Sequence, residues 1–146
     1  MKRATRLAAA LIAAGCAMQP GAPASELLDT YWRAVQIDGQ AIARRPGTRE
    51  VHIVLKREGS RISGFAGCNS FAGTFQQEGG ALRFGDKLAM TRMACVGEGD
   101  ALEGAFTRAL GSTASYRISG DRLELRDTTG AVRMTFEARA PAAAVK

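Results

Sequence analysis

Hydrophobic and polar residues alternate in several short segments of the chain, and turn-forming residues separate these segments. In segment 50–57 (EVHIVLKR), Val51, Ile53 and Leu55 fall on one face, and polar residues occupy most of the other. A period of two is typical of a half-buried β-strand. The turn residues at 58–60 (EGS) lead into a second such segment, so the two together predict a β-hairpin.

The same alternation recurs along the rest of the chain. Turns are predicted at 78–80, 119–121 and 127–130. Besides the segment at 50–57, strands are predicted at 31–37, 61–67, 73–77, 81–85, 86–93, 115–120, 122–127 and 132–138. In the last three strands, the residues predicted to face inward are Tyr116, Ile118, Leu123, Leu125, Val132, Met134 and Phe136.

One segment has the period of a helix instead. Within 100–111 (DALEGAFTRALG), apolar residues at i, i+3, i+4, i+7 and i+8 form one continuous face. Asp100 is in position to act as N-cap, with Glu103 completing a capping box, and Gly111 is expected to end the helix. The apolar face consists of Leu102, Ala105, Phe106, Ala109 and Leu110.

About eight strands joined mainly by hairpins, with one late helix, predict an α+β domain. We expect a strongly curved antiparallel sheet, a partial or cracked β-barrel, with the α-helix packed against it. The folded domain is predicted to span residues 27–139, and the tail 140–146 is expected to be loose.

The first 16 residues have the pattern of a lipoprotein-type signal peptide. A positively charged start precedes the short apolar run 7–15. Residues 13–16 (AAGC) resemble a lipobox, in which Cys16 would carry the lipid; the alternative is ordinary cleavage with Cys16 uninvolved. Residues 17–26 lack large side chains and are expected to be a flexible tether. Two or more acyl chains on Cys16 would give stable anchoring to the membrane.

The net charge of the chain argues against binding of nucleic acid. The full chain carries a net charge of +6, but Lys2, Arg3 and Arg6 would leave with the signal peptide, so that 17 basic side chains remain against 14 acidic ones. These charges are interspersed singly. A nucleic-acid surface requires clustered basic residues with stacking aromatic residues, and the sequence shows neither.

Two cysteines remain if Cys16 carries a lipid. Cys68 follows Gly67, Cys95 stands two residues before Gly97, and an even number of cysteines in an exported domain favours a disulfide. A loop of this length would contribute roughly 3–4 kcal/mol through the entropy of the unfolded chain.

Reactive alternatives for the cysteines have little support. A nucleophilic cysteine or a Ser-His-Asp triad needs a base, and the single histidine, His52, lies on the outer face of a predicted strand. A structural zinc site needs four ligands, usually in close cysteine pairs. The glycines at 64, 67 and 73 do not form a phosphate-binding loop. We therefore expect no catalytic residues, no metal and no cofactor.

Three motifs carry a resemblance to a known family. Gly67-Cys68-Asn69, the segment 91–95 (TRMAC) and the segment 123–127 (LELRD) resemble those of the META domain, the HslJ-like family of bacterial envelope proteins. The resemblance spans about residues 27–136 and implies a curved antiparallel sheet or cracked barrel with a packed helix. Members are often lipoproteins linked to envelope stress, and no catalytic activity is established for the domain as a class.

The resulting expectation is a non-enzymatic, disulfide-stapled envelope lipoprotein that has a stress-related role and binds a protein partner or supports envelope integrity. Asn69, Thr91 and Arg92 would form a binding surface; alternatively, Asn69 holds a turn and Arg92 caps carbonyl groups or pairs with a carboxylate. A second hypothesis is transport of a lipid or another hydrophobic ligand inside the partial barrel. A thiol–disulfide redox role ranks last, because the sequence has no C-x-x-C motif.

The location follows from the signal and the tether. We expect a monomer anchored by lipid at Cys16, facing the periplasm. Ala17, next to the lipid-bearing cysteine, favours the outer membrane.

Overall fold

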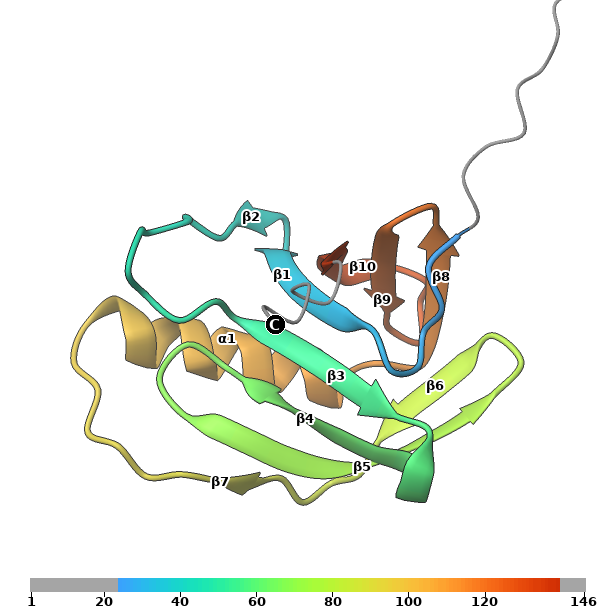
Figure 1. The fold of residues 1–146 in the computed structure, drawn as a ribbon, viewed down its shortest axis with the longest axis horizontal. Helices are drawn as coiled ribbons and strands as arrows, with labels where there is room; N and C mark the ends of the chain where they lie inside the picture. Colours follow the sequence, from blue (N-terminus) through green and yellow to red (C-terminus); the bar gives the residue numbers. More distant parts are fainter. Residues whose placement is uncertain (1–23, 140–146) are drawn as a thin grey trace, which may run out of the picture.

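The computed structural model describes residues 24–139, which form a closed antiparallel barrel with one helix (Figure 1). Ten strands and one α-helix occur in this part of the chain, together with a short 3₁₀ turn, η1, at Glu58–Ser60. The strands are β1 (Tyr31–Ile37), β2 (Gln40–Ala41), β3 (His52–Lys56), β4 (Arg61–Phe65), β5 (Ser70–Glu78), β6 (Ala81–Phe84), β7 (Ala89–Met90), β8 (Ser115–Ser119), β9 (Arg122–Arg126) and β10 (Val132–Arg139). The helix α1 spans Glu98–Gly111.

The sheet closes because its last strand pairs with its first. The order is β10-β9-β8-β6-β5-β4-β3-β1-β2, and an additional β10–β1 pairing joins the two ends. Eight strands therefore form the barrel, while β2 and β7 are short additions that pair with β1 and β5. The β6–β8 contact is the narrowest, with the single register pair Ala81–Ser115. The expected α+β fold with a strongly curved sheet of about eight strands is confirmed, and the curvature goes as far as closure.

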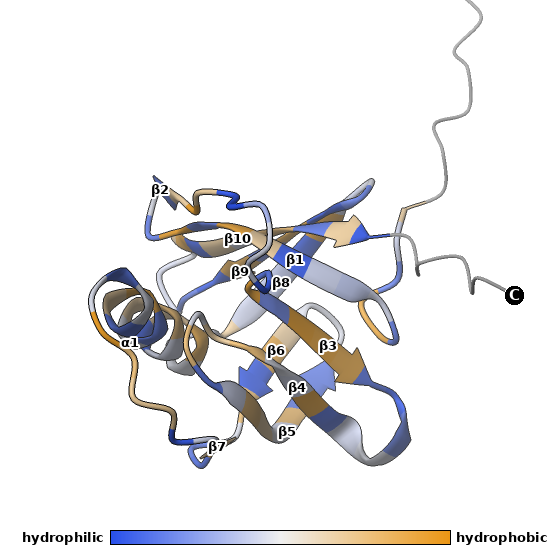
Figure 2. Ribbon diagram, turned by 60° about the vertical axis from the view of Figure 1, so that its left-hand side comes forward, coloured by the Kyte–Doolittle hydropathy of each residue, from blue (hydrophilic) through white to orange (hydrophobic). Residues whose placement is uncertain are grey.

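The interior of the barrel is filled with side chains. Figure 2 shows hydrophobic residues concentrated along β3, and the predicted inward residues Val51, Ile53 and Leu55 are all buried. The helix contributes Phe106, whose ring centroid lies 5.3 Å from that of Phe71. Large residues with less than 2% exposure include Trp32, Phe106, Phe136, Leu123, Leu125 and Met134. The residues that would line the ligand space of the carrier hypothesis thus belong to one packed core: Val51, Ile53, Leu55, Phe106 and Phe136.

Two β-bulges explain where the predicted alternation fails. In β1 the register shifts between Ala34 and Gln36, so that Ile37 is buried in place of Gln36. In β10 it shifts between Val132 and Met134. The prediction that Val132 faces inward is wrong, since its side chain is 39% exposed. A bulge inserts one residue into one strand only, and periodicity alone does not reveal it.

The ends of the helix differ from the prediction. The helix begins two residues before Asp100, and its N-cap residue is Gly97, which makes no side-chain capping bond. Asp100 is therefore not the N-cap, and Glu103 does not complete a capping box. Gly111 is the last helical residue, and Ser112 follows as the C-cap in right-handed helical geometry. Of the strand predicted at 86–93, only Ala89 and Met90 are in a strand.

No helix within residues 24–139 is long and apolar enough to cross a membrane. The predicted signal peptide, Cys16, most of the tether and the tail 140–146 lie outside the described residues.

A substitution at Gly64 in β4 can test how closely the neighbouring strands approach each other. A Cβ atom at this position would collide with the backbone carbonyl oxygen of His52 and lie 3.0 Å from the Phe71 ring. We expect Gly64→Ala to lower the free energy of unfolding by about 2 kcal/mol or more in urea denaturation, because the strands must separate. Gly80→Ala is the matched control, since nothing lies within 4 Å of its Cβ, and it should change stability by less than about 0.5 kcal/mol. Equal effects of the two substitutions would contradict the packing described for β4.

Candidate functional site

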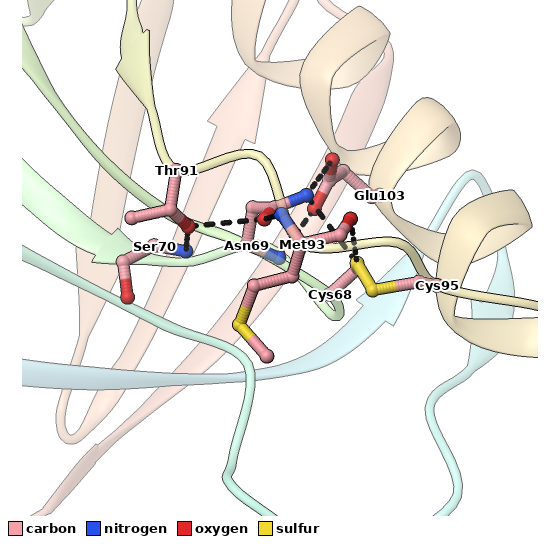
Figure 3. The surroundings of a disulfide bond; sticks show 7 residues. All are labelled: Cys68, Asn69, Ser70, Thr91, Met93, Cys95 and Glu103. Carbon is pink, nitrogen blue, oxygen red and sulfur yellow. Dashed lines mark hydrogen bonds between the residues drawn. A yellow bond between two sulfur atoms is a disulfide. The ribbon is translucent and has the colours of Figure 1, made fainter.

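A disulfide joins Cys68 to Cys95 at one end of the barrel (Figure 3). Cys68 lies in the turn between β4 and β5, and Cys95 lies in the segment between β7 and α1; their Cα atoms are 5.9 Å apart and their sequence separation is 27. The bond fixes the segment 91–97 against the barrel. This is the pairing that the cysteine count favours.

The side chain of Asn69 ties the same segment to the sheet and to the helix. Its Oδ1 accepts hydrogen bonds from the Met93 backbone N–H at 2.7 Å and from the Thr91 hydroxyl at 3.0 Å. Its Nδ2 donates to Glu103 Oε1 at 3.0 Å and lies 3.3 Å from Cys68 Sγ. One buried amide in the β4–β5 turn thus contacts two segments that are distant from it in sequence, the segment 91–93 and α1.

Glu103 and Thr91 complete this network. The Asn69 backbone N–H donates to Glu103 Oε2 at 2.6 Å, so the carboxylate accepts two bonds from a single residue. The Thr91 hydroxyl accepts the Ser70 backbone N–H at 3.1 Å, and the Thr91 N–H donates to the Ser70 carbonyl at 3.0 Å. Glu103 therefore connects the helix to the β4–β5 turn.

Gly67 is required in that turn for two reasons. Its φ of +122° lies in a region that residues with a side chain rarely adopt. A Cβ atom there would also come within 3.1 Å of the Leu102 side chain on α1. The turn and the helix are therefore in direct contact.

The expected binding residues have different environments. Asn69 is only 6% exposed, so it supports the turn from inside and does not present a surface. Thr91 and Arg92 are exposed. Within the described chain Arg92 has neither an ion pair nor a side-chain hydrogen bond, so the expected capping or pairing role of Arg92 is not seen there. Cys16 lies outside the described residues.

A groove of about 660 Å³ lies beside the disulfide end. Its walls are segment 40–51, which includes β2, and the first two turns of α1; Gly67 closes one side. Its floor is apolar and consists of Ala34, Ile37, Val51, Leu102 and Ala105, while its rim carries Arg33, Arg44, Arg45, Arg49, Glu50 and Glu98. No pattern in the sequence predicts this groove, because its two walls meet only in the folded chain.

The rim charges are partly paired. Arg45 forms an ion pair with Glu98 across the groove, and Arg44 lies 3.6 Å from Glu50. Arg49 donates to the Ser70 hydroxyl at 2.8 Å, and its guanidinium carbon lies 4.7 Å from the centroid of the Phe65 ring. In the part of the chain that the structure describes, Arg49 has no carboxylate within ion-pair distance.

The single histidine stands on the outer face near this rim. Its ring stacks on Tyr31, with centroids 4.4 Å apart, and its Nδ1 lies 2.9 Å from the Glu50 carbonyl oxygen. Partial burial lowers the pKa of His52 below its ordinary value, and the charge of Arg49 lowers it further, while the hydrogen bond to Glu50 opposes the shift. This arrangement holds the ring in place on the strand.

The geometry defines a class of protein, a small closed β-barrel whose disulfide end carries a helix and a groove. The family model of the META domain matches residues 25–140, so the chain belongs to the META-domain family. No curated protein matches the chain significantly.

Two solved structures share the fold. A protein from Burkholderia xenovorans, determined by NMR, is 27% identical over 89% of this chain and 100% of its own, with a TM-score of 0.62. A second NMR structure is 23% identical over 74% of this chain and 87% of its own, with a TM-score of 0.57, and this likeness concerns the fold alone.

Asn69 is predicted to contribute strongly to stability. Asn69→Ala removes the side-chain partner of the Met93 N–H and of Glu103 Oε1, while the backbone N–H at position 69 still donates to Glu103 Oε2. We therefore expect the free energy of unfolding to fall by about 2–4 kcal/mol. Arg92→Ala is the control, because Arg92 is exposed, and it should cost less than about 0.5 kcal/mol. Urea denaturation with the disulfide intact measures both. A loss for Asn69→Ala no greater than that of the control would show that the network does not hold the segment.

The histidine gives a prediction on pH dependence. We expect the NMR titration of His52 to have its midpoint below the ordinary pKa of 6.5. The unfolded chain then binds this proton at a higher pH than the folded chain does, so stability falls as the pH drops from 6.5 toward the folded-state pKa. Tyr31→Ala should raise the midpoint toward 6.5 by exposing the ring. A midpoint at or above 6.5 in the unmodified protein would contradict the assigned burial effect.

Proposed function

We propose that this protein is a non-enzymatic binding module of the bacterial cell envelope, anchored by lipid at Cys16, that holds a protein partner at its groove end in a stress-related role. The observation that carries the proposal is the groove beside the disulfide, which combines an apolar floor with a charged rim. Apolar pockets with a few convergent polar groups are the usual sites of ligand binding.

The position of the groove supports a tethered module. Near the start of the described residues, the Ser25 backbone N–H donates to the Gly120 carbonyl, and Leu28 forms a β-bridge with Leu55, the second-last residue of β3. The described chain therefore joins the barrel near the end of β3. The groove includes Val51, which precedes the first residue of β3. The entry point and the groove therefore lie toward opposite ends of that strand, whose course Figure 1 shows. A membrane anchor on the entry side would leave the groove facing away from the membrane.

The chemistry of the described residues supports binding over catalysis. Both cysteines of the described chain are paired with each other, and the His52 ring is held by Tyr31 and by a carbonyl group. Nucleophilic catalysis by cysteine requires a thiolate beside a base. The disulfide and the buried amide of Asn69 hold the helix side of the groove in place, and such preorganisation reduces the cost of binding.

Photo-crosslinking in intact cells tests the proposal. A photoreactive amino acid replaces Thr48 on the groove side or, as a control, Glu58 in the η1 turn at the other end; both positions are exposed. We expect discrete cross-linked products from position 48 and few from position 58. Cys16→Ser should abolish incorporation of an alkyne-labelled fatty acid and release the protein from the membrane fraction. Equal cross-linking at both positions, or unchanged membrane association of Cys16→Ser, would overturn the proposal.

A further inference from the structure

We infer that the groove recognises an acidic peptide segment of the partner, one in which carboxylates flank an apolar side chain. This inference rests on the proposed function and specifies the chemistry of the partner. It follows from the shape of the groove, the balance of its charges and the state of the backbone along one wall.

The shape fits a short peptide. A volume of about 660 Å³ lies within the range of about 300–1,000 Å³ that ligand pockets have. The floor residues Ala34, Ile37 and Val51 belong to the core, whereas Leu102 and Ala105 on α1 are only half-buried. An apolar side chain in the groove would cover the exposed part of Leu102 and Ala105.

The charges favour an acidic partner. The rim carries four arginines against two glutamates. Arg33 pairs with Glu137, and Glu50 is shared by Arg44 and Arg139, so that with these partners included five arginines meet three carboxylates. Arginine binds carboxylates through two parallel hydrogen bonds. Both partners of the Arg45–Glu98 pair are exposed, with side chains 59% and 77% exposed, and Arg44 is 66% exposed although its partner Glu50 is half-buried. Exposed ion pairs contribute little to stability, so an incoming carboxylate exchanges for them at small cost.

Arg49 is the rim arginine for which the described chain supplies no carboxylate partner. The Phe65 ring and the Ser70 hydroxyl hold its guanidinium in position, which reduces the entropy lost on binding. Since no carboxylate of the described chain pairs with it, Arg49 has donors free for a ligand.

The backbone of the groove wall favours a peptide over a lipid headgroup. Besides the ion pairs of the Arg44 and Arg45 side chains, the only hydrogen bonds seen in the described chain for residues 43–47 are the two that Thr48 donates to the Arg45 carbonyl. The strand β2, which also lines the groove, is the last in the sheet order, so its outer edge has no partner strand there. A peptide supplies the N–H and C=O groups that such an edge binds.

An NMR titration tests the inference on the full chain carrying Cys16→Ser. The probe is the peptide acetyl-Glu-Leu-Glu-Ile-Asp-amide, and its uncharged counterpart is acetyl-Gln-Leu-Gln-Ile-Asn-amide. We expect the acidic peptide to shift amide signals of segment 40–51 and of the first turns of α1, and to bind at least about tenfold more tightly than the uncharged one. The affinity should fall with added salt.

Matched variants locate the site. Arg44→Gln combined with Arg49→Gln should weaken binding of the acidic peptide about fivefold or more, whereas Arg83→Gln, on the exposed face of β6, should leave it unchanged. Ala101→Trp fills the groove without changing any charge and should also weaken binding. An unchanged melting temperature of each variant shows that folding is intact. Shifts that map elsewhere, or equal affinity for the two peptides, would overturn the inference.

A membrane ligand is the alternative that the same variants distinguish. The protein should not co-sediment with vesicles of phosphatidylglycerol and phosphatidylcholine in a way that depends on Arg44 and Arg49. If it does so, and the peptide fails to bind, the inference is wrong. If cross-linking at position 48 in cells persists in the Arg44→Gln and Arg49→Gln variant, the groove end binds a partner of another chemistry. In that case the acidic-peptide inference fails and the proposed function stands.

Discussion

The connection between the β4–β5 turn, the segment 91–97 and the helix is the constraint on which the groove end depends. A disulfide and one buried amide make this connection: Cys68 bonds to Cys95, and the adjacent Asn69 bonds to Met93, Thr91 and Glu103. The disulfide reduces the conformational entropy of the unfolded chain. In the folded chain, the hydrogen bonds of the amide fix the orientation of the turn, the segment and the helix relative to one another. Because the helix is attached to the barrel here, its first turns stand beside segment 40–51 and form the groove.

The division between core and groove explains how a small domain presents a charged concave surface. The barrel interior is packed with residues such as Trp32, Phe106 and Phe136, and this packing supplies most of the stability. The groove wall is mostly exposed loop that uses few of its own hydrogen-bonding groups. Such a loop keeps one position only when rigid elements hold both of its ends, here β1–β2 on one side and β3 on the other. Functional residues commonly lie on loops that a rigid scaffold positions.

Periodicity predicted the strands well because one face of nearly every strand meets the core. The segment 31–37 is a strand with the bounds predicted for it, and Leu123 and Leu125 are buried as expected. The predictions for single side chains were wrong where one local sequence pattern is compatible with more than one structure. Glu103 matches the spacing of a capping box, but its carboxylate binds Asn69 of another element. Val132 follows the alternation, but a bulge turns it outward.

The amino-acid sequence by itself determined the alternating strands, the helix, the cysteine pair and the family motifs, because each depends on residues close together in the chain or on the residue types alone. The closure of the sheet, the partners of Asn69 and the existence of the groove were decided only by the tertiary structure. Closure requires β1 and β10 to meet across more than a hundred residues, with Arg33 opposite Glu137. Such contacts depend on the summed twist of all the strands between them, and no local pattern in the sequence contains that sum.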